Sequence, residues 1–253
     1  MADPTVLRGD FLHQLVHVGD AAHRLLAMQD RDPLSPSFGS FHLAYWRDKT
    51  SEFGDARFQE AGAALGLLAH PAFRAIGLAR GWPKPEVLLD AFGAGLTNLA
   101  RLQYADGCYD EWYKGERGFA ATAFTTFAYA SAALELKGQL PAVTARLVRD
   151  TLAASARWLL ERDDLIKVNH EVVAAAALAA YGTLAADETS LAGARAKLAT
   201  ALATQQAEGW FPELRGMDFG YSALIVDYLG HYGRRMGMQT VADPARRLVA
   251  FEA

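Results

Sequence analysis

Residues 106–117 read Asp-Gly-Cys-Tyr-Asp-Glu-Trp-Tyr-Lys-Gly-Glu-Arg and run directly into the apolar segment 118–124, Gly-Phe-Ala-Ala-Thr-Ala-Phe. A loop with three aromatic rings, several carboxylates and an arginine therefore precedes a segment that must be buried. The same design returns at residues 208–213, Glu-Gly-Trp-Phe-Pro-Glu, and at 218–221, Asp-Phe-Gly-Tyr. We expect these loops to lie together at one end of an all-helical assembly and to form its working surface.

Helical periodicity covers most of the chain. A helix that is apolar nearly all round is buried on all sides, and the alanine-rich runs disfavour a sheet. The sequence therefore predicts an all-α protein built as an incomplete α/α toroid, a ring of about four inner and outer helix pairs. Amphipathic helices are expected over residues 10–30, 55–69, 86–104, 141–162 and 189–206, and nearly uniformly apolar ones over 119–136, 172–184 and 221–232. A short basic segment, 244–251, closes the chain.

The composition is that of a globular protein. Hydrophobic residues make up 51% of the 253-residue chain, which is long enough to bury a sizeable core as one domain over residues 1–253. The net charge is −4 and no basic block is present, so nucleic acid is not an expected partner. The single cysteine excludes an internal disulfide, no signal peptide is recognised, and the longest apolar run, 172–181, is too short to span a membrane. We expect a cytoplasmic protein.

Four loops combine aromatic and charged side chains. Aromatic rings stack on the apolar faces of sugars, and charged groups hydrogen-bond at the edges, so we expect a small-molecule or oligosaccharide ligand. The predicted ligand-binding side chains are Tyr45, Trp46, Lys49 and Arg57 in the first loop, Tyr109, Asp110, Glu111, Trp112 and Tyr113 in the second, and Trp210, Glu213, Arg215 and Asp218 in the fourth.

The third loop carries the sharpest local feature, Asn169-His170, at the entry to an apolar helix. A histidine in this place suits a general base, and an amide beside it can hydrogen-bond a substrate carboxyl group. Tyr221 stands at the equivalent entry to the last apolar helix and can give a proton to a leaving oxygen. The alternative is structural, with His170 and Tyr221 as helix-capping or core residues.

Loop carboxylates offer a second chemistry. Asp110, Glu111 and Glu213 can supply an acid and a base for cleavage of a glycosidic bond. Equally, Glu111 and Glu116 can pair with neighbouring cations and only brace the loop.

No metal or cofactor is expected. His13 and His17 are four residues apart on one predicted helix, but no third ligand is evident. The chain also lacks a nucleotide-binding loop, a dinucleotide fingerprint and a serine nucleophile elbow.

Taken together, these motifs resemble the α/α-toroid domain of alginate lyases and of heparinase II/III-type polysaccharide lyases. The resemblance rests on Asn169-His170 opening one inner helix and on 210–213, Trp-Phe-Pro-Glu, with Tyr221 opening a later one. In that family an asparagine neutralises a uronate carboxylate, while a histidine and a tyrosine act as base and acid in β-elimination. The resemblance implies these roles for Asn169, His170 and Tyr221, with Arg117 as a further charge-neutralising candidate.

Three functions remain open at this point. The first is a lyase-like enzyme acting on a uronate-containing glycan through Asn169, His170 and Tyr221. The second is a glycoside hydrolase or isomerase that uses the loop carboxylates. The third is a non-catalytic glycan-binding accessory protein of a polysaccharide pathway. The oligomeric state is also open.

Overall fold

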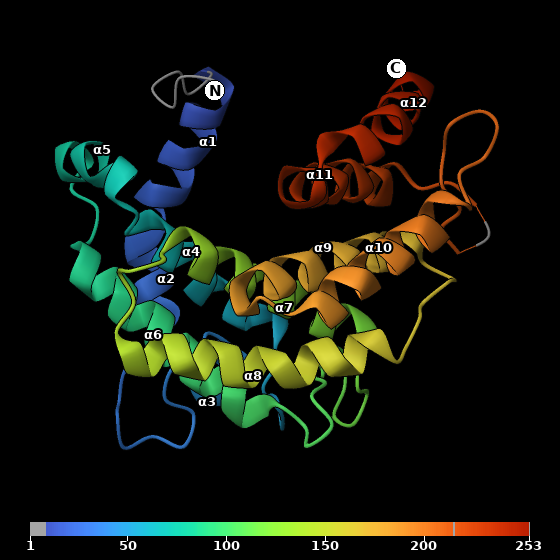
Figure 1. Ribbon diagram of the computed structural model, residues 1–253. Helices are drawn as coiled ribbons and strands as arrows, with labels where there is room; N and C mark the ends of the chain where they lie inside the picture. Colours follow the sequence, from blue (N-terminus) through green and yellow to red (C-terminus); the bar gives the residue numbers. More distant parts are fainter. Residues whose placement is uncertain (1–8, 215, 253) are drawn as a thin grey trace.

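The computed structural model describes residues 9–214 and 216–252, with side chains from Leu15 onward, and its regular structure is helical (Figure 1). Within these residues the β-type pairing is limited to isolated bridges, one of which joins Tyr109 to Gly118. The predicted all-α class is therefore confirmed. The side chain of His13 and the whole of Arg215 lie outside the described residues.

The chain forms twelve α-helices and three 3-10 turns within the described residues, and most of the α-helices belong to the packed pairs described below. The long helices are α1 (Gly9–Asp20), α2 (Ala22–Met28), α4 (Glu60–Leu68), α6 (Pro85–Leu102), α7 (Phe119–Glu135), α8 (Ala142–Leu160), α9 (Val168–Ala185), α10 (Glu188–Leu202), α11 (Phe219–Met236) and α12 (Ala242–Glu252). The short elements are α3 (Leu43–Trp46), α5 (Arg74–Arg80) and the 3-10 turns η1 (Arg57–Gln59), η2 (Pro71–Phe73) and η3 (Met238–Thr240).

Helix contacts follow a regular order. We call α4, α7, α9 and α11 the inner helices, because α7 packs against α4 and α9, and α9 packs against α11. The outer helices are their partners, with α6 against α4, α8 against α7, α10 against α9 and α12 against α11. Figure 1 shows α1 and α5 at the upper left, α11 and α12 at the upper right, and α6 to α10 below these two groups. This order is compatible with a series of inner and outer helix pairs.

Helix α9 is the centre of the core. Every residue from Val168 to Gly182 is buried, and the helix packs against α7, α8, α10 and α11. Six of the fifteen residues in this run are alanines, whose small side chains let neighbouring helices approach closely. The expectation that this segment is buried all round is confirmed.

Several helices begin or end at residues other than those predicted from the sequence. The expected helix over 10–30 is two helices, α1 and α2, that meet at Ala21. Helix α9 begins at Val168, four residues before the expected start, so Asn169 and His170 lie in its first turn. The N-cap of α10 is Asp187, whose carboxylate accepts from the backbone N–H groups of Thr189 and Ser190, rather than either of those two residues.

Among the described residues, no single helix combines the length and hydropathy needed to cross a membrane. Two consecutive helical segments, 57–68 and 71–80, have the required length and hydropathy only when they are counted together, and they are bent by 69° relative to each other.

The loop 106–117 depends on a close backbone approach at Gly107. Its φ is +103°, and a Cβ there would lie 2.3 Å from the carbonyl oxygen of Ala154 in α8. Gly115 in the same loop also has a positive φ, +84°, but a Cβ there would meet nothing within 4 Å. The two glycines therefore share backbone strain and differ in steric contact.

We expect Gly107→Ala to lower the free energy of unfolding by about 2 kcal/mol or more, because strain and overlap add. Gly115→Ala, which introduces strain alone, is expected to cost about 1 kcal/mol. Urea denaturation of the two variants measures the difference. Equal losses would show that the Gly107 contact with α8 does not hold the loop.

Candidate functional site

The N-terminal ends of the four inner helices meet at a cavity of about 280 Å³. Each inner helix contributes from its first turns, or from the turn η1 that precedes α4, and two loops complete the wall. The lining residues are Arg57; Glu111, Trp112 and Glu116; Phe119, Ala120 and Phe124; Asp164 and Lys167; Asn169 and His170; and Tyr221 and Leu224. Residues of the second and third predicted loops are therefore brought together with Arg57 of the first and Tyr221 of the fourth.

His170 forms the most defined polar contact of the cavity. Its Nδ1 lies 2.7 Å from Oδ2 of Asp164, which lowers the pKa of that carboxyl. The ring is largely buried and meets the Phe124 ring edge-on, with 6.4 Å between centroids. When Nδ1–H donates to Asp164, the opposite ring nitrogen, Nε2, keeps its lone pair and can accept a proton.

The backbone of Asp164 is positioned by the buried ion pair between Glu171 and Lys197. Its backbone N–H donates to the Glu171 carboxylate, which also accepts from Nζ of Lys197 at 3.1 Å. Lys197 further donates to Asp163 Oδ1 at 2.8 Å and to the Arg162 carbonyl at 2.5 Å. Burial raises the pKa of Glu171, while the Asp164 N–H and Lys197 oppose that shift. The ion pair thus ties the loop carrying Asp164 to both α9 and α10.

Asn169 joins α9 to the loop before α11. Its backbone N–H and its Nδ2 donate to the two carboxylate oxygens of Glu213, at 2.6 and 2.8 Å. Burial raises the pKa of Glu213, and the two hydrogen bonds from Asn169 oppose the shift. Glu213 therefore lies behind Asn169 and does not line the cavity. One amide hydrogen of Asn169 is committed to Glu213, which weakens its expected part in binding a substrate carboxylate.

Arg57 lies at the centre of a cluster of carboxyl groups. It pairs with Glu60, reaches Glu111 at 3.5 Å, and stacks over the Phe124 ring at 3.9 Å. Burial raises the pKa of Glu111, and the charge of Arg57 opposes this shift. Asp55 adds a third carboxyl group, whose pKa burial raises to about 7. Several carboxyl groups with raised pKa values beside one cavity are typical of a functional site.

Two further lining residues carry groups that a ligand can use. Trp112 is 75% exposed and offers its ring at the rim. Lys167 has no ion-pair partner within the described part of the chain, although it lies close enough to Glu111 and Asp164 to affect their pKa values. Tyr221, in the first turn of α11, adds a phenol to the same lining.

Several residues of the opening loop hold the loop rather than line the cavity. Asp110 is buried and accepts from the Tyr104 hydroxyl and from the N–H groups of Gly115 and Arg117. Tyr109 is fully buried in the core. The Arg117 guanidinium pairs with Asp106 at 2.7 Å. Tyr109 and Asp110, which were expected to contact a ligand, and Arg117, which was expected to neutralise charge, therefore lie outside the cavity lining.

Glu116 also braces this loop, by accepting from the N–H groups of Glu111 and Trp112 at 2.9 and 2.8 Å. Tyr113 is exposed and outside the cavity lining. The Cys108 thiol donates to Asp106, and burial raises its pKa to about 12, so the thiol is a poor nucleophile at neutral pH.

The remaining predicted ligand-binding residues lie elsewhere. In and after α3, the Trp46 indole N–H donates to the Met28 carbonyl, Tyr45 stacks on His42, and Lys49 is exposed. Trp210 packs near Phe251 of α12. Asp218 caps α11 by accepting from the Tyr221 N–H at 2.9 Å. None of these five lines the cavity, because local partners already occupy their polar groups or the side chains face other parts of the fold.

Sequence reasoning missed Asp164 and Lys167 as site residues. The available signal was the acidic pair 163–164, placed six residues before His170, but the spacing alone does not show that the loop folds back onto the helix. In the part of the chain that the structure describes, no group of three or more His, Cys, Asp or Glu side chains is arranged to hold a metal ion.

Comparison of the chain with protein-family models, with curated proteins and with solved structures found no match. The site's geometry must therefore carry the functional argument by itself.

The raised pKa of Asp55 gives a test of the carboxyl cluster. Between about pH 4 and pH 7 the unfolded chain loses the Asp55 proton while the folded protein keeps it, so this group makes stability fall as pH rises. Asp55→Asn removes that effect and can still accept from the Arg57 N–H. We therefore expect the variant to gain stability relative to the wild type at pH 8 compared with pH 4.

Thermal unfolding midpoints from pH 4 to pH 8 measure this difference. Asp243→Asn, on the exposed face of α12, controls for the loss of one surface charge. A stability difference between Asp55→Asn and wild type that is constant across the range would contradict the raised pKa.

Proposed function

We propose that the protein is a carbohydrate-active enzyme with an incomplete α/α toroid, and that it cleaves a uronate-containing glycan by β-elimination. The observation that carries the proposal is the His170–Asp164 pair at 2.7 Å on the lining of the cavity where the inner helices begin. A histidine oriented by a carboxylate, in a largely buried place, is equipped to remove a proton.

In the proposed reaction, Nε2 of His170 takes the proton from the carbon next to the uronate carboxylate. The electron pair of that C–H bond forms a double bond to the neighbouring carbon, whose bond to the glycosidic oxygen breaks. Asp164 stabilises the imidazolium that forms, and it also fixes the ring orientation. The base returns its proton to solvent afterwards.

Tyr221 is the proposed acid. Its phenol lines the same cavity as His170, and it can give its proton to the departing glycosidic oxygen. Solvent then restores the proton to the phenol. The products are an unsaturated uronate end and a free hydroxyl on the leaving sugar, with no external oxidant or reductant.

Charge neutralisation falls to Lys167 in this proposal, instead of Arg117. Proton loss next to a carboxylate becomes easier when a cation offsets the negative charge that develops. Lys167 lines the cavity without an ion-pair partner among the described residues, whereas Arg57 is already paired with Glu60 and Glu111. The inner helices begin at the cavity, so their N-terminal partial charges add a favourable potential for an anion.

The shape of the site suits a short piece of glycan. A volume of about 280 Å³ is near the lower end for small-molecule sites, which fits about one sugar unit. The exposed Trp112 ring at the rim offers a stacking surface for the next unit.

A second candidate is a glycoside hydrolase or isomerase. The observation that favours it is Glu111, which lines the same cavity and whose pKa is raised by burial. A carboxyl group that keeps its proton more readily than usual is suited to protonate a glycosidic oxygen. In that reaction a second carboxylate, not His170, would activate water.

The lyase proposal is tested by following the absorbance of the unsaturated product over a panel of uronate polymers and oligomers. We expect His170→Ala to lower kcat by about 10²- to 10⁴-fold and Tyr221→Phe by a similar factor, since each removes one proton transfer. His23→Ala, on the exposed side of α2, is the control and should keep wild-type activity. A wild-type protein that produces no unsaturated ends from any of these substrates would rule the proposal out.

Glu111→Gln separates the two candidates. A lyase that relies on His170 should keep measurable turnover in this variant, because the amide preserves the shape of the side chain. A hydrolase should lose turnover by about 10²-fold or more, since the proton donor is gone. Product analysis decides between them, because hydrolysis releases saturated reducing ends that do not absorb.

A further inference from the structure

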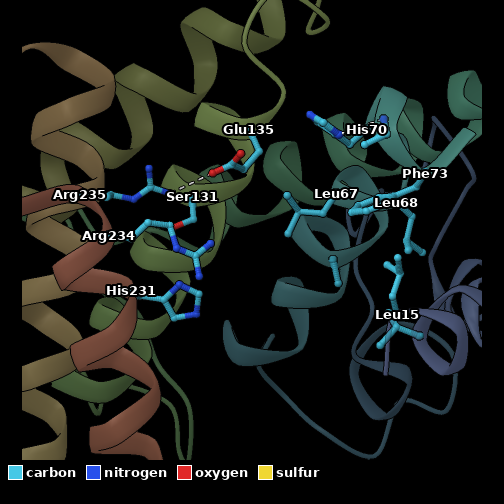
Figure 2. Close-up of a pocket in the computed structure, with 13 residues that line it drawn as sticks. Leu15, Leu67, Leu68, His70, Phe73, Ser131, Glu135, His231, Arg234 and Arg235 are labelled. Carbon is cyan, nitrogen blue, oxygen red and sulfur yellow. Dashed lines mark hydrogen bonds and ion pairs between the residues drawn. The ribbon is translucent and has the colours of Figure 1, made fainter. Parts of the chain in front are cut away.

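A second and larger cavity, of about 470 Å³, lies at the opposite ends of the same helices. Where the candidate site uses the first turns of α7 and α11, this cavity uses their last turns, together with the end of α4, η2 and part of α1. Figure 2 shows the side chains that line it. It shares no lining residue with the candidate site.

The two walls of this cavity differ in chemistry. One wall, from α1, α4 and η2, is mostly apolar and includes Leu15, Leu67, Leu68 and Phe73, with His70 at the start of η2 as a polar group. The facing wall, from the ends of α7 and α11, is polar and carries Arg234 and Arg235, with His231 and Glu135 beside them. Figure 2 shows these two groups on opposite sides of the cavity. An occupant must therefore be apolar on one side and polar on the other.

The polar wall carries two arginines, and only one of them is in an ion pair among the described residues. Arg235 lies 3.5 Å from Glu135, so these two charges offset each other. Arg234, in the part of the chain that the structure describes, has no ion-pair partner. Basic residues in a last turn favour the helix itself. Arg234 is exposed and also lines the cavity, so its guanidinium is open to a ligand.

Ser131 adds a further polar group to the polar wall of the cavity. It lies on the cavity lining in α7, and its buried hydroxyl has no hydrogen-bond partner among the described residues. A buried donor without a partner costs free energy. The oxygen is shielded, so Ser131 makes this wall polar without offering the occupant a direct contact.

We propose that this cavity binds a single-chain fatty carboxylate, with its alkyl chain against Leu67, Leu68 and Phe73 and its carboxylate at Arg234. The apolar wall supplies the burial that holds the chain. The unpaired guanidinium supplies a charge-assisted hydrogen bond for the head. The inference does not depend on the proposed lyase function.

Binding is tested with dodecanoate below its micelle-forming concentration, by titration calorimetry on the wild-type protein. We expect one saturable site per chain, and a dissociation constant raised about tenfold or more by Arg234→Glu. Ala64→Trp, which places a large ring in the cavity, should abolish binding. Arg246→Glu reverses an exposed charge on α12, outside the cavity, and should bind as the wild type does.

Two comparison ligands define the chemistry of the occupant. Butanoate, which has the head without the chain, and dodecanol, which has the chain without the charge, should each bind more weakly than dodecanoate by tenfold or more. Dodecanol bound as tightly as dodecanoate would overturn the role of Arg234. Dodecanoate binding that is unaffected by both Arg234→Glu and Ala64→Trp would overturn the site.

The wild type and the Arg234→Glu variant also distinguish a fatty carboxylate from other occupants of the cavity. Arg234-dependent association with vesicles of anionic phospholipid, without dodecanoate binding, would indicate a membrane-facing surface and overturn the proposal. Arg234-dependent dimerisation in sedimentation velocity, again without dodecanoate binding, would assign the face to a second copy of the chain and overturn it as well.

Discussion

Helix α9 is buried on all sides, and three polar residues in its first turn must therefore find partners inside the protein. Asn169 pairs with Glu213, His170 with Asp164, and Glu171 with Lys197. A buried polar group without a partner is costly, so each pairing also fixes the position of the element that supplies the partner. Through these contacts α9 holds α10, the loop after α8 and the loop before α11.

The same constraint produces the candidate site. The inner helices all begin at one end of the assembly, and the polar groups that satisfy their first turns gather there with the loop residues. Most of these groups already form hydrogen bonds or ion pairs within the protein. Glu116, for example, accepts hydrogen bonds from two backbone N–H groups. Groups that a ligand can still use include Nε2 of His170, the Tyr221 phenol, the Lys167 ammonium, the Trp112 ring and the Glu111 carboxyl.

The opposite ends of the inner helices line the second cavity, whose side chains differ in chemistry from those of the candidate site. The last turns of α4 face this cavity with α1 and η2 through aliphatic and aromatic side chains, while α7 contributes Ser131 and Glu135 and α11 ends in Arg234 and Arg235. One set of helices thus encloses a polar cavity at its beginning and an amphipathic one at its end. The two ends can therefore be altered separately, because no lining residue is common to both.

The sequence by itself determined the all-α class, most of the helices and the buried nature of residues 172–182, because hydrophobic periodicity and alanine content report on burial directly. It also identified His170 and Tyr221, since both stand at the entry to an apolar helix. Only the tertiary structure decided which loop residues face the cavity. Tyr109 and Trp112 are three residues apart in one loop, yet one is fully buried and the other is 75% exposed. The direction of a loop side chain depends on turns such as the left-handed backbone at Arg117 and on partners distant in sequence, and composition reports neither.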